Sequence, residues 1–214
     1  MFFIFFLVIK PKTPLQQGKP ILLYDSSGRE GETDIVIHAK YASPQIIRLM
    51  RKQAGGLICL AVGEQIAETL NLPHLTDIIE ETPLHELSPL KTAYGDKPAF
   101  SWPINHKDTY TGITDEDRSL TITRFQQIIE QQQQHEKFVK QFYAPGHVPL
   151  LCARNINHRR GHTELSIELA KHAHLTECMV LCEMMADDHK ALSHREAEKY
   201  AKTNNLLMVD GESI

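Results

Sequence analysis

The connection between the first two apolar runs constrains the fold more than any other stretch of the sequence. Residues 21–25 and 34–40 are both apolar runs of strand length, and only SSGREGET separates their cores. A helical crossover between parallel strands needs a dozen or more residues, so this connection is too short to contain one. The sequence therefore predicts a mixed sheet rather than a purely parallel one.

Strand-like and helical patterns alternate along the rest of the chain. Further apolar runs of strand length lie at residues 56–62, 99–105, 148–154, 178–185 and 206–210. Helical patterns lie at residues 64–70, 124–142 and 164–174, and two more helices are expected after the N-caps Ser43 and Ser193. We expect an α+β fold of three layers, α/β/α, built on a mixed, mostly seven-stranded sheet.

The organisation of the chain indicates one domain over residues 1–214, because no stretch has the composition of an interdomain linker. Two long loop-like segments, 73–98 and 103–117, interrupt the pattern, and long loops inside compact domains are commonly functional or disordered. The opening MFFIFFLVIK is apolar over residues 1–9, too short for a helix that crosses a bilayer. We expect this opening run to pack on the domain or on a partner subunit.

Composition is ordinary for a globular protein and argues against two kinds of partner. The chain has 214 residues, of which 42% are hydrophobic and 23% charged. Its net charge of −4 does not support a general surface for nucleic acid or for an anionic membrane. The four cysteines lie in or beside apolar runs and include no CxxC pair, so we expect reduced, mostly buried thiols in a cytoplasmic protein without structural zinc.

The segment REGETD contains three carboxylates at alternate positions, Glu30, Glu32 and Asp34. If the segment is extended, these side chains project to one face, where their mutual repulsion favours a bound cation. Mg²⁺ suits such a place because it prefers oxygen ligands and often shares its coordination between carboxylates and a substrate. The alternative is a solvated acidic turn.

The segment NHRRGHTELSIELAKHA resembles a helix start built to bind an anion. Thr163 can cap the helix, Gly161 allows close approach of a ligand, and Arg159 and Arg160 come just before it. His162 at the helix tip can bind a metal or carry a proton. The alternative is an ordinary capped helix with surface arginines.

Two isolated polar residues and one polar loop complete the candidate chemistry. His147 lies at the mouth of a strand, and Glu183 lies in a strongly apolar run, where a carboxylate is rarely buried without a partner or a function. A carboxylate in such a run is a candidate general base or acid. The loop TYTGITDEDR is interpreted as a hydrogen-bonded turn, with a second anion site as the alternative.

The order of these motifs is more specific than any one of them. The blocks REGETD, GGLIC, TGITDEDRSLTI, PGHVPLL, RRGHTE and CEMMADD follow one another across residues 29–188. This arrangement resembles the 3,4-dihydroxy-2-butanone 4-phosphate synthase family of riboflavin biosynthesis, in its single-domain form. The resemblance covers roughly residues 18–210.

The resemblance implies a lyase that converts D-ribulose 5-phosphate to L-3,4-dihydroxy-2-butanone 4-phosphate and formate. The family needs a divalent cation, usually Mg²⁺ with Mn²⁺ as an alternative, and works as a homodimer with active sites near the subunit interface. Its metal ligands match Glu30 and His162, and its catalytic residues match His147 and Glu183. The positions that contact the substrate and its phosphate match Arg29, Glu30, Asp34, Arg159, Arg160, Gly161, His162, Thr163 and Glu183.

Other classes of function remain open from the sequence. A non-catalytic relative that binds sugar phosphates would be expected to have lost one of the residues Glu30, His147, His162 or Glu183, and all four are present. Another metal-dependent sugar-phosphate lyase or isomerase is the nearest enzymatic alternative. A nucleotide-binding or RNA-binding module would need a broad basic groove, which the net charge disfavours.

Overall fold

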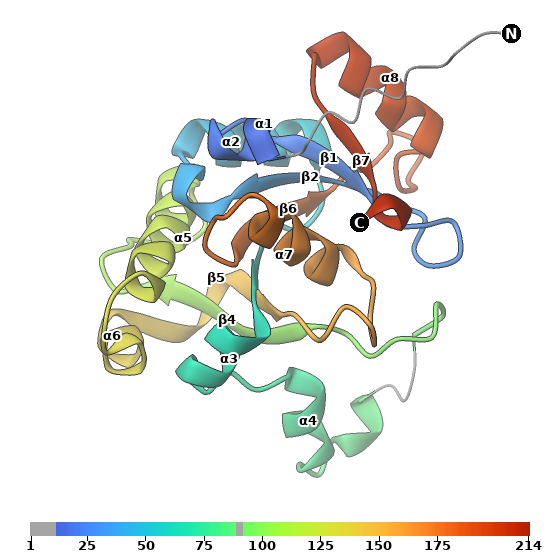
Figure 1. Cartoon of the computed structure of the whole chain (residues 1–214). Coiled ribbons are helices and arrows are strands. Elements are labelled where there is room, and N and C mark those ends of the chain that lie inside the picture. The colour runs from blue at the N-terminus through green and yellow to red at the C-terminus, as the bar shows by residue number, and fades with distance from the viewer. Residues whose placement is uncertain (1–11, 89–91) are drawn as a thin grey trace, which may run out of the picture.

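The computed structural model describes residues 12–88 and 92–214, so the prediction for residues 1–9 lies outside the described part of the chain. The core is a seven-stranded sheet in the order β4-β5-β3-β6-β2-β1-β7 (Figure 1). The strands are β1 (Ile21–Tyr24), β2 (Thr33–His38), β3 (Cys59–Val62), β4 (Phe100–His106), β5 (Phe142–Cys152), β6 (Cys178–Glu183) and β7 (Met208–Asp210). Each of them overlaps one of the seven apolar runs, so the predicted sheet is confirmed.

The sheet is mixed, as the short first connection requires. Strand β1 pairs antiparallel with β2 and parallel with β7, while β3 pairs parallel with β5. The central strand β6 runs antiparallel to both of its neighbours, β2 and β3. This order places the end of β6 beside the start of β2, which brings together segments that are far apart in the sequence.

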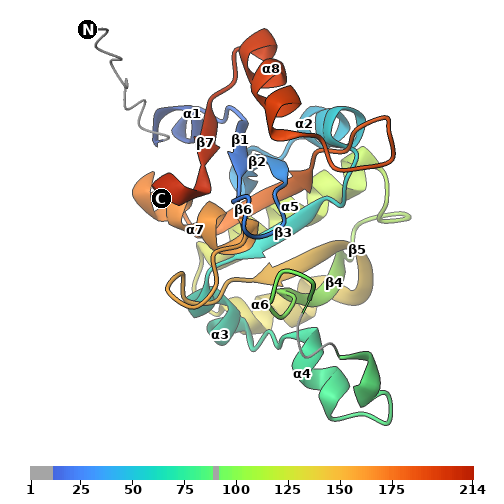
Figure 2. The ribbon, with the colours of Figure 1, turned by 90° about the vertical axis from the view of Figure 1, so that its right-hand side faces the viewer.

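Helices cover both faces of the sheet and make the three predicted layers. They are α1 (Lys12–Gln16), α2 (Pro44–Leu49), α3 (Glu64–Leu70), α4 (Leu75–Glu80), α5 (Asp115–Ile129), α6 (Gln134–Gln141), α7 (His162–His172) and α8 (His194–Asn204). Figure 2 shows α1 and α7 on one side of the strands and α2 on the other. The alternation of strand residues explains this, because Ile35 and Ile37 belong to one buried cluster and Val36 to the other.

The prediction of one helix over residues 124–142 is wrong. Helix α5 ends at Ile129, Gln133 is left-handed with φ 58°, and α6 ends where β5 begins. In one straight helix Phe125 and Phe138 would lie about 20 Å apart at 1.5 Å per residue. The break instead brings their ring centroids to 5.7 Å, and Phe142 packs 5.5 Å from Phe138. Burial of aromatic rings therefore outweighs continuation of a polar helix.

The described parts of the two segments predicted as long loops contain regular secondary structure. Residues 73–98 contain α4 and a 3₁₀ turn, and residues 103–117 contain the end of β4 and the first turn of α5. The predicted N-caps are confirmed, since the hydroxyls of Ser43 and Ser193 accept the backbone N–H groups of Ile46 and Glu196. All four cysteines are free and buried. Within residues 12–88 and 92–214, no helix combines the length and the apolar character needed to cross a membrane.

Candidate active site

The candidate site lies where β1 and β6 end and β2 begins, around the start of α7. Asp34 on β2 and Glu183 on β6 are direct partners in the antiparallel register, so both carboxylates project from the same face of the sheet. The connection between β1 and β2 supplies Arg29 and Glu30. Helix α7 supplies His162, its first residue.

The connection between β1 and β2 is folded around Asp25. The fully buried Asp25 carboxylate accepts the backbone N–H groups of Glu30 at 3.0 Å and of Glu32 at 3.1 Å, and it pairs with Arg29 Nη1 at 3.2 Å. A buried carboxylate with three donors is well satisfied, so it can hold the turn in one conformation. Asp25 was not among the predicted site residues. A carboxylate directly after a buried strand was the signal that could have found it.

The carboxylates converge although the segment is extended only from Thr33, where β2 begins, so the condition under which their convergence was expected is met only in part. Residues 27–30 form a turn. Gly31 follows it in a left-handed conformation that favours glycine, with φ 67°, and donates its backbone N–H to the carbonyl oxygen of Ser26 at 3.0 Å. All three predicted carboxylates still line one cavity, of about 330 Å³. His162, Thr163, Arg159 and Glu183 line the same cavity.

His162 lies at the centre of the carboxylates. Its Nδ1 is 3.4 Å from Glu30 Oε2, and its Nε2 is 3.6 Å from Asp34 Oδ1 and 3.1 Å from the carbonyl oxygen of Glu32. Burial opposes a charged imidazole, but the carboxylates of Asp34 and Glu30 outweigh it and raise the pKa of His162. The imidazole therefore favours its charged form here when no cation is bound.

The two carboxylates beside His162 have opposite pKa shifts. Burial would raise the pKa of Glu30, but His162 and Arg29 outweigh it and lower that pKa to about 2. Burial raises the pKa of Asp34. His162 opposes this shift, but the negative charges of Glu183 and Glu30 add to the increase. Glu30 is thus kept ionised, while the pKa of Asp34 is shifted toward neutral pH. Acid–base catalysis requires such a difference between neighbouring carboxylates.

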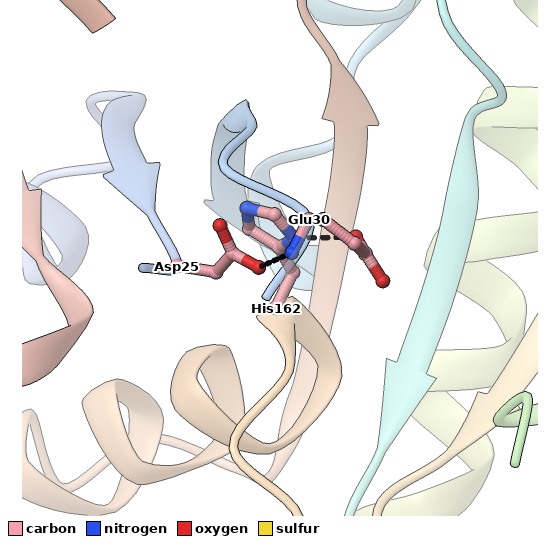
Figure 3. A group of neighbouring side chains, drawn as sticks. All are labelled: Asp25, Glu30 and His162. Carbon is pink, nitrogen blue, oxygen red and sulfur yellow. Dashed lines mark hydrogen bonds and ion pairs between the residues drawn. The ribbon is translucent and has the colours of Figure 1, made fainter. Parts of the chain in front are cut away.

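Asp25, Glu30 and His162 form a group that can hold a metal ion. One donor atom from each lies within 4.8 Å of the others, and the three come from the β1–β2 connection and from α7 (Figure 3). Asp34 Oδ1, 3.6 Å from His162, is buried and has no hydrogen-bond partner among the described residues. Carboxylate oxygens with an imidazole and an orphaned buried oxygen fit a hard divalent cation such as Mg²⁺. The structure therefore brings together the predicted ligands Glu30 and His162 and adds Asp25.

Helix α7 begins earlier than predicted, with Gly161 rather than Thr163 as its N-cap. The buried Glu164 carboxylate accepts the Gly161 N–H at 3.2 Å and forms an ion pair with Arg159. This pair points the Arg159 guanidinium toward the cavity. Arg160 instead donates to the carbonyl oxygen of Gly211 at 3.0 Å, so the structure does not bring this predicted substrate ligand to the cavity.

Glu183 and Cys59 form the wall of the cavity on the side of the sheet. The Glu183 carboxylate accepts the backbone N–H of Leu57 at 2.8 Å, which orients it while leaving it partly exposed. Cys59 is buried on β3, and burial together with the charges of Glu183 and Asp34 raises the pKa of its thiol. Cys59 is therefore a neutral thiol at neutral pH that lines the site.

The structure does not bring His147 to the cavity. It lies exposed on β5, where its Nδ1 is 3.1 Å from the Asn105 amide nitrogen and its backbone N–H donates to Asn105 Oδ1 at 2.8 Å. The nearby loop at residues 109–118 is the predicted hydrogen-bonded turn, because the Asp117 carboxylate accepts the backbone N–H groups of Tyr110, Thr111 and Gly112.

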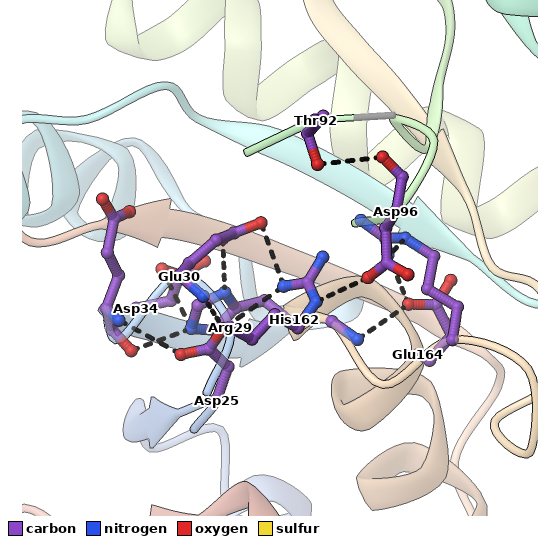
Figure 4. Close-up of polar contacts among 11 residues, drawn as sticks. Asp25, Arg29, Glu30, Asp34, Thr92, Asp96, His162 and Glu164 are labelled. Carbon is purple, nitrogen blue, oxygen red and sulfur yellow. Dashed lines mark hydrogen bonds and ion pairs between the residues drawn. The ribbon is translucent and has the colours of Figure 1, made fainter. Parts of the chain in front are cut away.

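Two contacts to Arg29 come from residues 73–98, the segment predicted as a long loop. Arg29 Nε donates to Asp96 Oδ2 at 2.8 Å, and the Arg29 guanidinium lies 4.6 Å from the centroid of the Tyr94 ring. Figure 4 shows Arg29 between Glu30 and Asp96. No local pattern marks Tyr94 or Asp96, since they meet Arg29 only after β4 is placed in the sheet.

Comparison with known proteins agrees with this geometry. A family model described as 3,4-dihydroxy-2-butanone 4-phosphate synthase matches residues 12–214. The chain belongs to this family. The 3,4-dihydroxy-2-butanone 4-phosphate synthase of Methanothermobacter thermautotrophicus is 43% identical over 208 residues, which cover 94% of this chain and 90% of the relative. The synthase of Methanosarcina mazei is 41% identical over 212 residues, which cover 94% of this chain and 86% of the relative.

A solved structure shares the fold of this synthase. The crystal structure of 3,4-dihydroxy-2-butanone 4-phosphate synthase in complex with two magnesium ions superposes with a TM-score of 0.74. The two chains are 22% identical, and the match covers 94% of this chain and 91% of the other. The predicted membership of the family is therefore confirmed by sequence, and the three-layer architecture by structure.

Proposed function

We propose that this synthase converts D-ribulose 5-phosphate to L-3,4-dihydroxy-2-butanone 4-phosphate and formate in riboflavin biosynthesis, with Mg²⁺ as its cation. The observation that carries the proposal is the convergence of Glu30, His162, Asp34 and Glu183 on one cavity that also contains Arg159. Binding of a phosphorylated sugar and proton transfer require three features that this cavity combines. They are a group of residues that can hold a metal ion, two carboxylates in register on neighbouring strands, and an arginine at the start of a helix.

Glu30 and His162, with Asp25, would hold the cation. When bound, it would supply Lewis-acid stabilisation of the negative charge that develops on the oxygens of the substrate. Arg159 and the N-terminus of α7 bind the phosphate, because the helix dipole and the guanidinium both favour an anion there. Arg29, Thr163 and the backbone at Gly161 complete the surroundings of the phosphate.

Asp34 and Glu183 are placed to move protons. They face each other across neighbouring strands, so both can reach the same substrate. The raised pKa of Asp34 suits a group that gains and loses a proton near neutral pH. Cys59 lines this wall of the cavity, and the raised pKa of its thiol disfavours the thiolate, so it does not act as a base there.

A homodimer would account for the exposed position of His147 outside the cavity of its own chain. Trp102 and Tyr143 are 38% and 42% exposed on β4 and β5, and together with Val139 they line an apolar groove of about 230 Å³. Exposed aromatic side chains of this kind are typical of subunit interfaces. We propose that this face meets a second copy of the chain and that His147 completes the site of the partner.

Mixing two inactive variants tests the shared site. His147→Gln and Glu30→Gln each remove one half of a site, and random reassociation of a two-fold dimer would restore about a quarter of the wild-type sites. If His147 acts within its own chain, the mixture stays inactive. Light scattering on the unmixed proteins gives the oligomeric state independently.

The reaction itself is tested by incubating the purified protein with D-ribulose 5-phosphate and following formate by proton NMR. Formate that forms with Mg²⁺ and stops with a chelator supports the proposal. An isomerised sugar without formate would favour the alternative enzyme, and bound but unchanged substrate would favour a binding protein. Use of Mn²⁺, a cytoplasmic location and a single domain over residues 1–214 stay predictions.

A further inference from the structure

The turn at residues 92–96 places a carboxylate on the two arginines of the proposed phosphate site. Asp96 Oδ2 lies 2.8 Å from Arg29 Nε and 4.0 Å from Arg159 Nε. The turn is closed by Thr92, whose backbone N–H and hydroxyl both donate to the carbonyl oxygen of Asp96, at 3.0 and 2.9 Å (Figure 4). The carboxylate therefore belongs to a defined turn that lies against the site.

Both guanidinium groups are buried and have N–H donors without a hydrogen-bond partner in the described part of the chain. Each arginine side chain is only 8% exposed, yet Arg29 Nη2 and Arg159 Nε have no hydrogen-bond partner within the described ranges. A β-carbon added at Gly161 would lie 2.7 Å from Arg29 Nη2 and 2.6 Å from Arg159 Nη1, so both groups press on the same backbone at the start of α7. Buried unpaired donors on two cations indicate a place for an anion with several oxygens.

Among the carboxylates around these arginines, Glu30 also pairs with Arg29, at 2.9 Å, but its other oxygen lies 3.4 Å from His162 in the group assigned to the cation. Of the other three, Asp96 is held most weakly. Asp25 accepts two backbone N–H groups, from Glu30 and Glu32, and is fully buried. Glu164 likewise accepts two backbone N–H groups and is 1% exposed. Asp96 is 27% exposed, and among the described residues its side-chain oxygens accept a hydrogen bond from Arg29 alone. Asp96 is therefore the carboxylate that an incoming anion can replace at the lowest cost.

We propose that Asp96 is an internal anion that holds the place of a phosphate monoester on Arg29 and Arg159. The inference rests on the proposed function, since it assumes that these arginines bind the phosphate of the substrate. A phosphate dianion that replaces the Asp96 carboxylate takes over its contact with Arg29 Nε and reaches the unpaired Arg29 Nη2 and Arg159 Nε. Tyr94 keeps its ring on the Arg29 guanidinium during the exchange and so holds this arginine in position.

The exchange makes Asp96 a determinant of affinity and selectivity. Every phosphorylated ligand must displace the same carboxylate, which lowers the affinity of each of them. A ligand with further groups in the cavity overcomes this competition, whereas free phosphate does not. Asp96 thereby disfavours occupation of the site by inorganic phosphate.

The test compares Asp96→Asn with Glu80→Gln by titration calorimetry with inorganic phosphate. Glu80 is a matched control, because its carboxylate is also near the turn but pairs with Lys97 at 2.8 Å rather than with the two arginines. Removing one competing charge is expected to tighten phosphate binding by Asp96→Asn roughly five- to tenfold, with no change for Glu80→Gln. Asp96→Ala, which also removes the hydrogen bond to Arg29, serves as a second variant and is expected to act in the same direction.

The kinetic expectation separates competition from a structural role. If Asp96 competes with the substrate, the KM for D-ribulose 5-phosphate falls in Asp96→Asn while kcat does not rise. Unchanged or weaker phosphate binding would overturn the proposal, because Asp96 would then only orient Arg29. An equal increase in phosphate affinity in Glu80→Gln would also overturn the proposal, because the loss of any negative surface charge would then explain the increase.

Repeating the titrations with Mg²⁺ and with chelator identifies the group that binds phosphate. A gain seen in both buffers is expected, whereas a gain confined to Mg²⁺ would show that phosphate contacts the cation and would overturn the proposal. The outcome is also separable from the proposed reaction. Tighter phosphate binding by Asp96→Asn without any formate from the wild type would refute the reaction and leave the anion exchange standing.

Discussion

Replacement of Asp25 by asparagine tests whether this single carboxylate folds the β1–β2 connection. Asp25 accepts two backbone N–H groups and contacts Arg29, and its side chain is fully buried. An asparagine of the same shape can accept at only one of its two terminal atoms, so its amide group would face a backbone N–H donor. One unsatisfied buried donor costs about 1–3 kcal/mol, and a weakened buried contact with Arg29 adds to it. We expect Asp25→Asn to lower the free energy of unfolding by about 2–4 kcal/mol.

Urea unfolding in the presence of a chelator measures this loss, because the chelator removes any stabilisation by a bound cation. Asp210→Asn is the matched control. Asp210 ends the neighbouring strand β7, pairs in register with Tyr24, and its side chain accepts one backbone N–H, from Glu212 at 2.9 Å. Because Asp210 is exposed, its replacement is expected to cost no more than about 1 kcal/mol. An Asp25→Asn protein as stable as wild type would refute the role given to Asp25.

Two further predictions address the metal group and the helix break. Glu30 has a pKa near 2, below its ordinary 4.5, so its ionised form stabilises the fold above pH 4.5 and this contribution disappears as the pH falls toward 2. Between pH 4.5 and 2, the free energy of unfolding of Glu30→Gln, measured with urea in the presence of a chelator, should therefore fall less than that of the wild type. An equal fall in both proteins would contradict the role given to the lowered pKa of Glu30. Gln133 is left-handed with φ 58°, so Gln133→Gly should raise the free energy of unfolding by about 0.5–1 kcal/mol. Gln132→Gly is the control, since residue 132 does not have a positive φ, and a similar gain there would show that the strain at Gln133 is not the cause.

The strands were predictable because each is a local pattern. An apolar run of strand length is buried wherever the sheet forms, and the short connection after β1 excludes a crossover at that point. The break between α5 and α6 was not predictable in this way. It depends on the packing of Phe125, Phe138 and Phe142, whose contacts join residues distant along the chain.

The candidate site was likewise predictable only in part. The motifs containing Glu30, Asp34, His162 and Glu183 were visible in the sequence, and the structure brings all four to one cavity. Arg160 belongs to the same motif as Arg159, but its side chain is directed to Gly211 by the packing of the last residues of the chain. Neighbours in a motif can thus lie on opposite sides of one loop, because successive side chains of an irregular segment need not share a direction.

The sequence alone determined which chemical groups are present and which local segments carry them. Only the tertiary structure decided which of these groups meet. Asp34 faces Glu183 because β6 lies between β2 and β3, and Asp96 reaches Arg29 because the turn at residues 92–96 contacts the β1–β2 connection. The physical reason is that burial and hydrogen bonding act between segments far apart in the chain, so strand order and register, rather than local propensity, set the surroundings of each carboxylate.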